Sequence, residues 1–326
     1  MSDTLKILTE VDFDAASLQK LREAAQTDIT VILDPQGFQN ALREAEIVCG
    51  ATIPDNVLET APRLRWIQYI GAGIEKLRST GLLDPDSRVI LTRASGVHVT
   101  QISEYVFGSI LMFNRSWPQM LDLQHRHIWP RHSSEYHLAQ RELTGRTLGI
   151  VGLGSIGRGI AHLGRAFGMK VIASRFSAHP GESDPDVDAL YTMDQLHTLL
   201  GQSDYVVLAV PLTERTEKLI GEAELHAMRH DAYLVNIARG RVIDEAALIR
   251  ALQERWIAGA GLDVAAEEPL PPESPLFDAP NLILSPHISG ASDYYNVRLA
   301  DLFAENLRRY RAGQPLRNQY DPAKGY

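Results

Sequence analysis

The sequence has very few features that would cross-link the chain or anchor it in a membrane. Cys49 is the only cysteine among 326 residues, so no disulfide can form within the chain, and we expect Cys49 to be a small core residue. No run approaches the ~20 consecutive apolar residues that a membrane span requires, and residues 1–10 lack the basic and apolar regions of a secretion signal. We therefore expect a cytoplasmic protein with no membrane partner.

The chain also lacks an excess of basic residues. Its 41 Asp and Glu outnumber its 32 Lys and Arg, which gives a formal net charge of −9 at pH 7. Binding to nucleic acid needs a basic face that neutralises phosphates, so we expect no nucleic-acid partner. The composition is otherwise that of a globular protein. Because one domain typically has about 100–150 residues, a chain of this length predicts two domains.

The strongest pattern is a glycine-rich turn between a strand and a helix. Leu148–Val151 is an apolar run typical of a strand buried on both faces, and Gly152, Gly154 and Gly157 follow at G-x-G-x-x-G spacing. An apolar stripe at steps of three and four then predicts a helix, with Ile156, Ile160, Leu163 and Phe167 on one face. Residues 170–174 have the pattern of the next strand.

Each of these glycines has a mechanical role in a dinucleotide site. Gly152 permits the tight turn, Gly154 lets the backbone approach a pyrophosphate, and Gly157 lets the helix pack closely on the strand. The free N–H groups at the start of the helix face the anion. The alternative is a glycine turn that binds nothing. With strand, helix and second strand in place, the pattern predicts a Rossmann domain that binds a dinucleotide.

Apolar runs alternate with helical patterns in the residues before this motif. We expect strands at residues 6–9, 29–33, 47–50, 64–70 and 89–91, and helices at 13–25, 38–45 and 56–60. This alternation predicts a parallel sheet with helices on both faces. The fourth run ends at Ile70, and the turn Gly71-Ala72-Gly73 follows. Its N–H groups could hold a small carboxylate, or it could be a tight turn with no ligand.

The second half of the chain predicts six further strands, the number that a two-halved dinucleotide-binding sheet requires. We place them at residues 148–151, 171–174, 205–210, 233–237, 259–264 and 282–285. A helix at residues 99–114 crosses into this domain, and a long amphipathic helix at residues 292–311 returns to the first. We therefore expect an α/β protein of two doubly wound parallel-sheet domains, one built from residues 1–98 plus 287–326 and the other from residues 99–286.

Residues 115–141 are expected to be irregular. They contain Trp117, Trp129 and Tyr136, together with four histidines at positions 125, 127, 132 and 137. A metal site would need a matched carboxylate or cysteine cluster, which this stretch lacks, so we expect none. An aromatic, histidine-bearing arm of this kind more often packs on a partner subunit.

Three predicted strands of the second half end in polar or charged residues, which are uncommon in a protein core. Arg239 lies in VNIARG, Asp263 and Glu268 lie in LDVAAEEP, and His287 lies in SPHISG. Because the carboxyl ends of parallel strands meet at one edge of a sheet, these side chains could converge on a nicotinamide ring. Arginine offers a fork for a carboxylate, and histidine exchanges a proton near neutral pH. Singly each residue has a structural alternative, as an ion pair, a solvated side chain or a loop residue. Jointly they favour catalysis.

These motifs resemble those of the D-isomer-specific 2-hydroxyacid dehydrogenases over nearly the whole chain. The matching segments are GAGIE at 71–75, ELTGRTLGIVGLGSIGRGIA at 142–161, PLTERTEKLI at 211–220, VNIARGRVIDEAAL at 235–248, LDVAAEEPLPPESPLF at 262–277 and NLILSPHISG at 281–290. The resemblance implies a flavodoxin-like substrate domain, a Rossmann domain, and a homodimer whose arm is residues 115–141. The implied enzyme is like the glyoxylate/hydroxypyruvate reductases, which transfer a hydride between NAD(P)H and a small 2-oxo acid to give a D-2-hydroxy acid.

The same resemblance implies roles for individual residues. Arg239 would bind the substrate carboxylate and polarise its carbonyl, His287 would protonate the carbonyl oxygen, and Glu268 would favour the protonated form of His287. The substrate would also contact residues of the first glycine turn, namely Ile70, Gly71, Ala72 and Gly73. Asp263 would hold the nicotinamide carboxamide. The other residues that we expect to contact the cofactor are Gly152, Gly154, Ser155, Ile156, Gly157, Ser174, Arg175, Val210, Pro211, Thr216, Ile237 and Ala238.

One departure from the family pattern bears on the cofactor. In NAD-dependent relatives the strand after the glycine motif ends in an aspartate that accepts hydrogen bonds from the adenosine ribose, and here that position is Arg175. Arginine offers a cation and a fork of donors that match a 2′-phosphate, and Ser174 and Ser177 could add hydroxyls. We expect NADPH to be preferred, with NADH possible. The alternative is that Arg175 points into solvent and either cofactor is accepted.

Other functions are compatible with parts of the pattern. Some relatives act as nucleotide-sensing transcriptional corepressors, but the intact set of Arg239, Glu268 and His287 weighs against that role here. Formate dehydrogenases of similar fold lack the acidic partner of the histidine. Phosphite dehydrogenases carry a lysine in the first glycine turn, where this chain has Ala72. A 2-oxo-acid reductase is therefore favoured.

Overall fold

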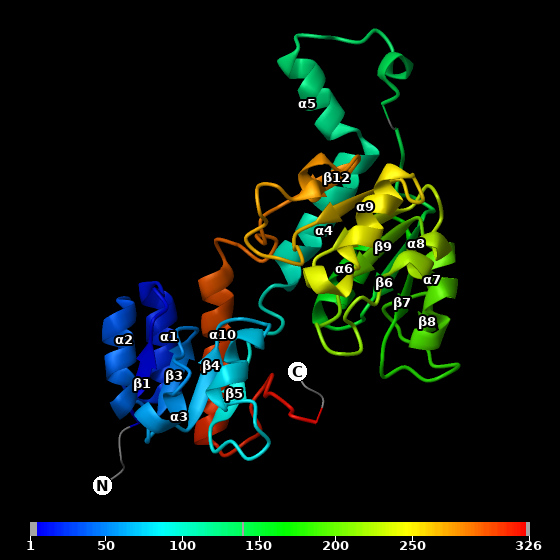
Figure 1. The fold of residues 1–326 in the computed structure, drawn as a ribbon. Helices are drawn as coiled ribbons and strands as arrows, with labels where there is room; N and C mark the ends of the chain where they lie inside the picture. Colours follow the sequence, from blue (N-terminus) through cyan, green and yellow to red (C-terminus); the bar gives the residue numbers. More distant parts are fainter. Residues whose placement is uncertain (1–4, 139, 324–326) are drawn as a thin grey trace. The chain divides into compact units, whose positions relative to one another are not determined.

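The chain forms two structural units, each built around a parallel sheet. The computed structural model describes residues 5–138 and 140–323 (Figure 1). The first unit is Met1–His98 with Ala291–Tyr326, and the second is Val99–Gly290. The sequence had suggested that the first unit resumes at residue 287. It resumes later because Ile288 and Ser289 donate backbone hydrogen bonds to the side chain of Asp263 in the second unit.

The first unit is a five-stranded parallel sheet in the order β2-β1-β3-β4-β5. Its strands are β1 (Ile7–Thr9), β2 (Ile29–Val31), β3 (Ile47–Gly50), β4 (Trp66–Tyr69) and β5 (Ile90–Thr92). Its helices are α1 (Ala15–Ala25), α2 (Pro35–Ala41), α3 (Val57–Thr60) and α10 (Tyr295–Arg311), with 3-10 turns at Leu42–Glu44 and Glu75–Thr80. Cys49 is fully buried in this core, and burial raises the pKa of its thiol.

The C-terminal helix α10 completes the core of the first unit. Its apolar face buries Leu299, Phe303 and Leu307 in the same cluster as Leu21 of α1 and Trp66 of β4. The Trp66 and Phe303 rings meet edge to face with their centroids 5.4 Å apart. Burying a side chain as large as Phe contributes about 1.5–3 kcal/mol. The two ends of the chain therefore depend on each other for a common core, which makes this unit discontinuous in sequence.

The second unit is a seven-stranded parallel sheet in the order β12-β11-β10-β9-β6-β7-β8. Its strands are β6 (Thr147–Val151), β7 (Lys170–Ser174), β8 (Ala189–Tyr191), β9 (Tyr205–Leu208), β10 (Tyr233–Asn236), β11 (Gly259–Leu262) and β12 (Leu282–Leu284). Its helices are α4 (Val99–Asn114), α5 (Trp117–His125), α6 (Ser155–Ala166), α7 (Leu196–Gln202), α8 (Glu222–Ala227) and α9 (Glu245–Gln253), with 3-10 turns at Ser133–Tyr136, Met193–Gln195, Gly240–Val242 and Pro275–Asp278.

The two faces of this sheet pack on different helices. Alternate residues of a strand point to opposite faces. Tyr205 and Val207 accordingly join a core with α4 and α6, whereas Val206 and Leu208 join a core with α7, α8 and α9. Helices on both faces of a parallel sheet are the doubly wound arrangement that the sequence predicted. None of the helices in the described residues is long and apolar enough to cross a membrane.

Two elements of the second unit differ from the sequence prediction. The sheet has seven strands instead of six, because β8 pairs with β7 at the sheet edge and its three half-buried residues are too few to give a periodic signal. The stretch expected to be irregular contains the helix α5, which has Pro118 in its first turn and buries only Leu123. A helix that buries one residue has almost no apolar periodicity from which to predict it.

Candidate active site

The predicted cofactor and catalytic residues of the second unit follow the ends of its strands. The glycine turn follows β6, Arg175 follows β7, residues 237–239 follow β10, Asp263 follows β11 and His287 follows β12. Because every strand in the sheet is parallel, these ends lie along one edge. The carboxyl edge of an open parallel sheet is where such folds bind ligands.

The glycine turn has the geometry of a phosphate cradle. Gly152 adopts φ 106°, and a Cβ there would lie 2.6 Å from the carbonyl oxygen of Ala209. A Cβ on Gly157 would overlap the carbonyl oxygen of Gly152, whereas a Cβ on Gly154 would meet nothing within 4 Å. Among the described residues, no side chain caps the first turn of α6, which begins at Ser155. An open glycine beside uncapped N–H groups fits the pyrophosphate of a dinucleotide.

Two buried polar atoms lie at the end of β7. Within the described residues, Ser174 Oγ and Arg175 Nε are buried and make no hydrogen bond. Such atoms are uncommon in folded proteins and fit a site that a ligand completes. The outer nitrogens of Arg175 are engaged, because Nη2 donates to Glu182 and Nη1 lies 3.5 Å from Asp184. The guanidinium of Arg175 therefore does not point freely into solvent, because it is paired with two carboxylates at the position expected for a phosphate.

The loop after β9 is organised by Thr216. Its hydroxyl donates to the carbonyl of Pro211 at 2.6 Å and accepts from the N–H of Thr213 at 2.8 Å. Val210 and Thr216 are buried, with 5% and 1% of their surfaces exposed. Thr216 thus shapes the loop through bonds to its own backbone. The remaining predicted residues next to the glycine turn differ in burial, since Ser155 is exposed and Ile156 is half-buried.

Asn236, a residue that the sequence analysis did not single out, holds the segment that carries Arg239. Its amide donates to the carbonyl of Arg239 at 3.0 Å and accepts from the N–H of Ala238 at 3.0 Å. Ile237 and Ala238 are buried, and the Arg239 guanidinium donates to the carbonyl of Ala238 at 2.7 Å. A buried asparagine as the last residue of a strand was the available signal for this role.

Glu268 and His287 form the pair expected of an acid–base centre. Glu268 Oε2 lies 2.6 Å from His287 Nδ1, and its other oxygen accepts the N–H of Ala265 at 3.1 Å. The side chains are 37% and 48% exposed. With Nδ1 held by the carboxylate, Nε2 is the nitrogen left to exchange a proton with a ligand.

Asp263 fixes the backbone around His287. Its side chain is 1% exposed, and it accepts the hydroxyl of Ser285 at 2.5 Å and the N–H groups of Ile288 and Ser289 at 2.9 and 3.0 Å. Its own carbonyl accepts the N–H of His287 at 2.8 Å. The contact between Asp263 and the nicotinamide carboxamide stays a prediction. In the structure, both of its carboxylate oxygens are committed to the segment that bears the histidine.

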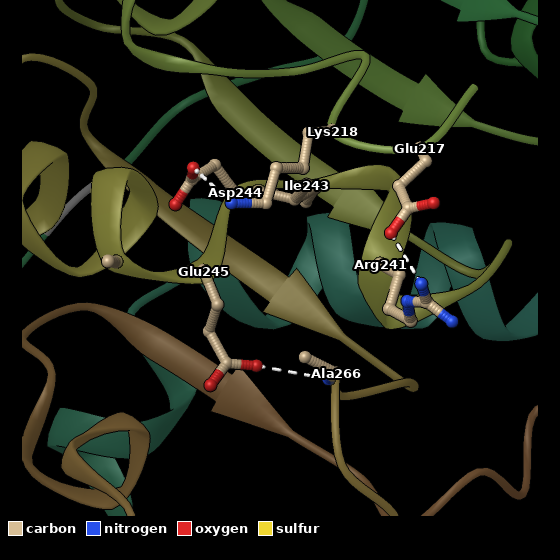
Figure 2. A pocket seen from close by; sticks show the side chains of 8 residues that line it. Glu217, Lys218, Arg241, Ile243, Asp244, Glu245 and Ala266 are labelled. Atoms are coloured by element: carbon tan, nitrogen blue, oxygen red, sulfur yellow. Dashed lines mark hydrogen bonds and ion pairs between the residues drawn. The ribbon is translucent and has the colours of Figure 1, made fainter. Parts of the chain in front are cut away.

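A surface pocket of about 480 Å³ is lined by Ala266 and by residues from the segments 217–218 and 241–246 (Figure 2). Its charged residues pair with each other, Lys218 with Asp244 at 3.1 Å and Arg241 with Glu217 at 2.5 Å. Lys218 lowers the pKa of Asp244. Figure 2 also shows Glu245 reaching the backbone of Ala266, whose N–H it binds at 3.0 Å. None of Arg239, Glu268 and His287 lines this pocket, so it is separate from the acid–base pair.

In the first unit, the turn Gly71-Ala72-Gly73 is held through its carbonyl groups. Tyr295 of α10 donates to the carbonyl of Ile70, the N–H of Ala94 donates to that of Gly71 at 3.0 Å, and Arg93 donates to that of Ala72 at 3.3 Å. A side chain at Gly71 would press on the ring of Tyr69. With these carbonyls bonded, the turn presents a fixed backbone at the end of β4.

Known proteins are similar in sequence to most of this chain. Residues 107–289 match the family described as D-isomer specific 2-hydroxyacid dehydrogenase, NAD binding domain. A glyoxylate reductase from Korarchaeum cryptofilum is 35% identical over 263 residues, which cover 80% of this chain and 77% of that protein. A glyoxylate reductase from Thermococcus gammatolerans is 36% identical over 270 residues, which cover 80% of this chain and 78% of that protein.

Solved structures agree with this match. A D-isomer specific 2-hydroxyacid dehydrogenase family protein from Aeromonas salmonicida superposes with a TM-score of 0.83 at 32% identity, covering 98% of this chain and 100% of that chain. An NADPH-dependent glyoxylate/hydroxypyruvate reductase from Sinorhizobium meliloti, in complex with NADP and sulfate, gives a TM-score of 0.81 at 27% identity, covering 99% of this chain and 100% of that chain. The chain therefore belongs to the D-isomer specific 2-hydroxyacid dehydrogenase family and is an NAD(P)-dependent enzyme with a Rossmann NAD-binding domain.

Proposed function

We propose that this enzyme reduces a small 2-oxo acid to a D-2-hydroxy acid and prefers NADPH to NADH. The observation that carries the proposal is the 2.6 Å contact between Glu268 and His287 at the sheet edge that bears the dinucleotide turn and Arg239. Glyoxylate and hydroxypyruvate are the first substrates to consider, because the relatives at 35–36% identity are named glyoxylate reductases and the Sinorhizobium meliloti neighbour is named a glyoxylate/hydroxypyruvate reductase.

The proposed chemistry uses three side chains. A reduced nicotinamide dinucleotide bound at the glycine turn would supply the hydride, which leaves negative charge on the carbonyl oxygen of the oxo acid. His287 donates a proton to that oxygen from Nε2, while Glu268 stabilises the imidazolium through Nδ1. Arg239 pairs with the substrate carboxylate through its planar fork. In the oxidative direction His287 begins neutral and accepts the proton.

The preference for NADPH rests on the end of β7. Ser174 Oγ and Arg175 Nε are buried polar atoms without a bond, and a 2′-phosphate would give both an acceptor. A carboxylate at position 175 would instead repel the phosphate. An enclosed arginine–phosphate contact contributes about 1.5–3 kcal/mol, which corresponds to a roughly 10- to 200-fold preference in kcat/KM.

We also infer a homodimer in which residues 115–141 contact the partner subunit. In Figure 1, α5 and the segment after it extend away from the sheet of the second unit. This arm carries a group of large exposed apolar side chains: Trp117 at 50%, Met120 at 36%, Leu121 at 41%, Trp129 at 93% and Tyr136 at 38%. Apolar groups gathered on one exposed segment are typical of a protein–protein contact.

The test is a kinetic panel with both cofactors. Oxidation of NADPH and NADH is followed with glyoxylate, hydroxypyruvate, pyruvate, ketopantoate and phenylpyruvate, using His287→Ala as the inactive control. Turnover of at least one oxo acid, with NADPH favoured, supports the proposal. Binding of NADP⁺ without turnover of any oxo acid would favour a nucleotide-sensing role instead, and reduction of NADP⁺ by phosphite would favour a phosphite dehydrogenase.

A further inference from the structure

The guanidinium of Arg175 is occupied by carboxylates from its own chain. Nη2 donates to Glu182 Oε1, and Nη1 lies 3.5 Å from Asp184 Oδ2. Both acidic residues belong to the loop between β7 and β8. The side chain of Arg175 is 26% exposed, that of Glu182 is 32% exposed and that of Asp184 is 7% exposed. The cation expected to meet a 2′-phosphate therefore already has anionic partners.

The two carboxylates are held to different degrees. Asp184 binds Arg158 of α6 through two hydrogen bonds, of 2.9 and 2.7 Å, and is nearly buried. Arg175 is the one Arg or Lys that pairs with Glu182 among the residues that the structure describes, and the other oxygen of Glu182 accepts the N–H of His179 at 3.0 Å. Asp184 thus belongs to a packed ion pair with Arg158, whereas Glu182 is the more exposed partner and can leave Arg175 without breaking a pair with a second arginine.

Glu182 is charged when the enzyme works near neutral pH. The N–H of His179 and the charge of Arg175 lower the pKa of this carboxyl below its ordinary value. A carboxylate and a phosphate present the same kind of charged acceptor to a guanidinium fork. Only one of them can take the Nη2 hydrogen bond in the geometry that Glu182 uses.

We propose that Glu182 is a specificity-determining residue that occupies the 2′-phosphate position on Arg175, so that NADPH must displace it while NADH leaves it in place. The inference rests on the proposed role of Arg175 in cofactor choice. Glu182 would then lower the affinity for NADPH relative to NADH, and replacing Glu182 would raise that relative affinity. The effect of Glu182 on binding depends on the ligand, because only a dinucleotide with a phosphate on its adenosine ribose competes with the Glu182 carboxylate for Arg175.

The expected size follows from competition. A ligand whose binding-competent state is only partly populated has its dissociation constant raised by the inverse of that population. A partly exposed ion pair is modest in strength, so Arg175 is free of Glu182 for roughly a sixth to two fifths of the time. Glu182→Gln should therefore tighten NADP⁺ binding by about 2- to 6-fold and leave NAD⁺ binding unchanged.

The experiment is calorimetric titration of the purified full chain with NADP⁺ and with NAD⁺, without substrate. Glutamine keeps the size of the side chain and can still accept the N–H of His179 through its amide oxygen, so the loop is preserved. Glu222→Gln is the matched control, because Glu222 pairs with Arg250 at 2.6 Å on the exposed surface and loses the same charge. Tighter NADP⁺ binding in Glu182→Gln alone supports the proposal. An unchanged dissociation constant, or an equal gain for NAD⁺, overturns it.

A double-variant cycle separates this inference from the proposed cofactor preference. In the Arg175→Ala background, Glu182→Gln should no longer tighten NADP⁺ binding. A gain that persists there would mean that Glu182 repels the phosphate directly, which overturns the proposal as stated. If Arg175→Ala weakens NADP⁺ binding while Glu182→Gln has no effect, only the role of Glu182 fails. If Arg175→Ala has no effect in either the parent or the Glu182→Gln background, the proposed reading of the phosphate by Arg175 fails as well.

Discussion

His287 has an unusual backbone conformation for a residue with a side chain. It adopts φ 54°, in the left-handed region that side chains other than glycine seldom occupy. Such a conformation costs about 1–3 kcal/mol and persists only where the surroundings enforce it. Here the bonds from residues 287–289 to the carbonyl and carboxylate of Asp263 enforce it. These bonds fix the backbone at His287, and its Nδ1 lies 2.6 Å from Glu268.

We expect His287→Ala to lower kcat by about 10²- to 10⁴-fold, the usual contribution of a positioned acid, while NADP⁺ still binds. The measurement is steady-state reduction of the best oxo acid, with cofactor binding followed separately. His197→Ala is a matched control, because His197 of α7 also pairs with a carboxylate, that of Glu224 at 2.8 Å, and is not one of the predicted site residues. Near-parent turnover in His287→Ala would remove this residue from the mechanism.

Glu268→Gln tests the electrostatic part of the pair. The carboxylate stabilises the imidazolium across 2.6 Å, and the amide removes that charge at constant size. The reductive rate should then begin to fall at a lower pH than in the parent, because the proton donor is lost earlier as pH rises. The pH profile of kcat/KM is the readout. Profiles that superimpose would show that Glu268 acts only through position.

At the scale of elements, the loop that carries Glu268 is held by two contacts at Ala265 and Ala266. A Cβ on Gly240, the residue after Arg239, would overlap the carbonyl carbon of Ala265. On the other side, Glu245 at the start of α9 binds the N–H of Ala266 at 3.0 Å (Figure 2). The 3-10 turn beside Arg239, the start of α9 and the Glu268 loop therefore form one packed junction.

Gly240→Ala should displace this junction. The overlapping atoms are backbone atoms that cannot rotate away, so the Glu268 loop must move, and misplacement of about 1 Å in an active site can cost about 10²-fold in rate. We expect a loss of kcat together with a lower melting temperature. Gly201→Ala is the control, because its nearest atom, the carbonyl oxygen of Ala227, would lie at 3.4 Å, an ordinary contact. Parent-like kcat in Gly240→Ala would show that the loop tolerates the shift.

At the scale of the whole molecule, carboxylates paired with basic side chains link stability to pH. Arg158 lowers the pKa of Asp184, Lys218 lowers that of Asp244, and Arg309 lowers that of Glu305. A carboxyl whose folded pKa is depressed contributes stability above its unfolded pKa and loses it as pH falls through the folded pKa. The ordinary values are 3.8 for Asp and 4.5 for Glu.

The melting temperature should therefore stay nearly constant from pH 7 to about pH 5 and fall steadily below about pH 4.5. Scanning calorimetry across this range is the measurement. Asp184→Asn should melt lower than the parent at pH 7 and lose less on acidification, because one linked carboxyl is absent. A parent whose melting temperature is flat down to pH 3 would contradict this account.

The proposed dimer is also a property of the whole molecule. Replacing two exposed apolar side chains of the arm, Leu121→Glu with Trp129→Glu, should shift the mass measured by light scattering from dimer to monomer, because charges would be buried without partners. Phe277→Glu is the control, since Phe277 is 57% exposed and lies outside the arm. If the double variant and the control both keep the parent mass, the arm does not hold the subunits together.

Local pattern was enough to predict most of the elements and which polar residues follow the strand ends. The helix at Val99–Asn114 has the predicted bounds, and the glycine turn lies between β6 and α6 as its spacing indicated. Arg239, Asp263 and His287 could be placed at strand ends because apolar runs stop at recognisable residues, and parallel strands bring those ends to one edge. These features depend on neighbours in sequence, which is why the sequence alone determined them.

What the tertiary structure decided depends on residues far apart in the chain. Strand β8 is stabilised by pairing with β7 and not by its own three residues. Asp263 turned out to hold the segment at 285–289, Glu182 turned out to occupy Arg175, and the second unit extends to Gly290 because of the bonds to Asp263. The sequence determines the charge of a side chain and the hydrogen bonds that it can make. Its partner is determined only by folding, which brings groups from distant segments within about 3 Å of each other.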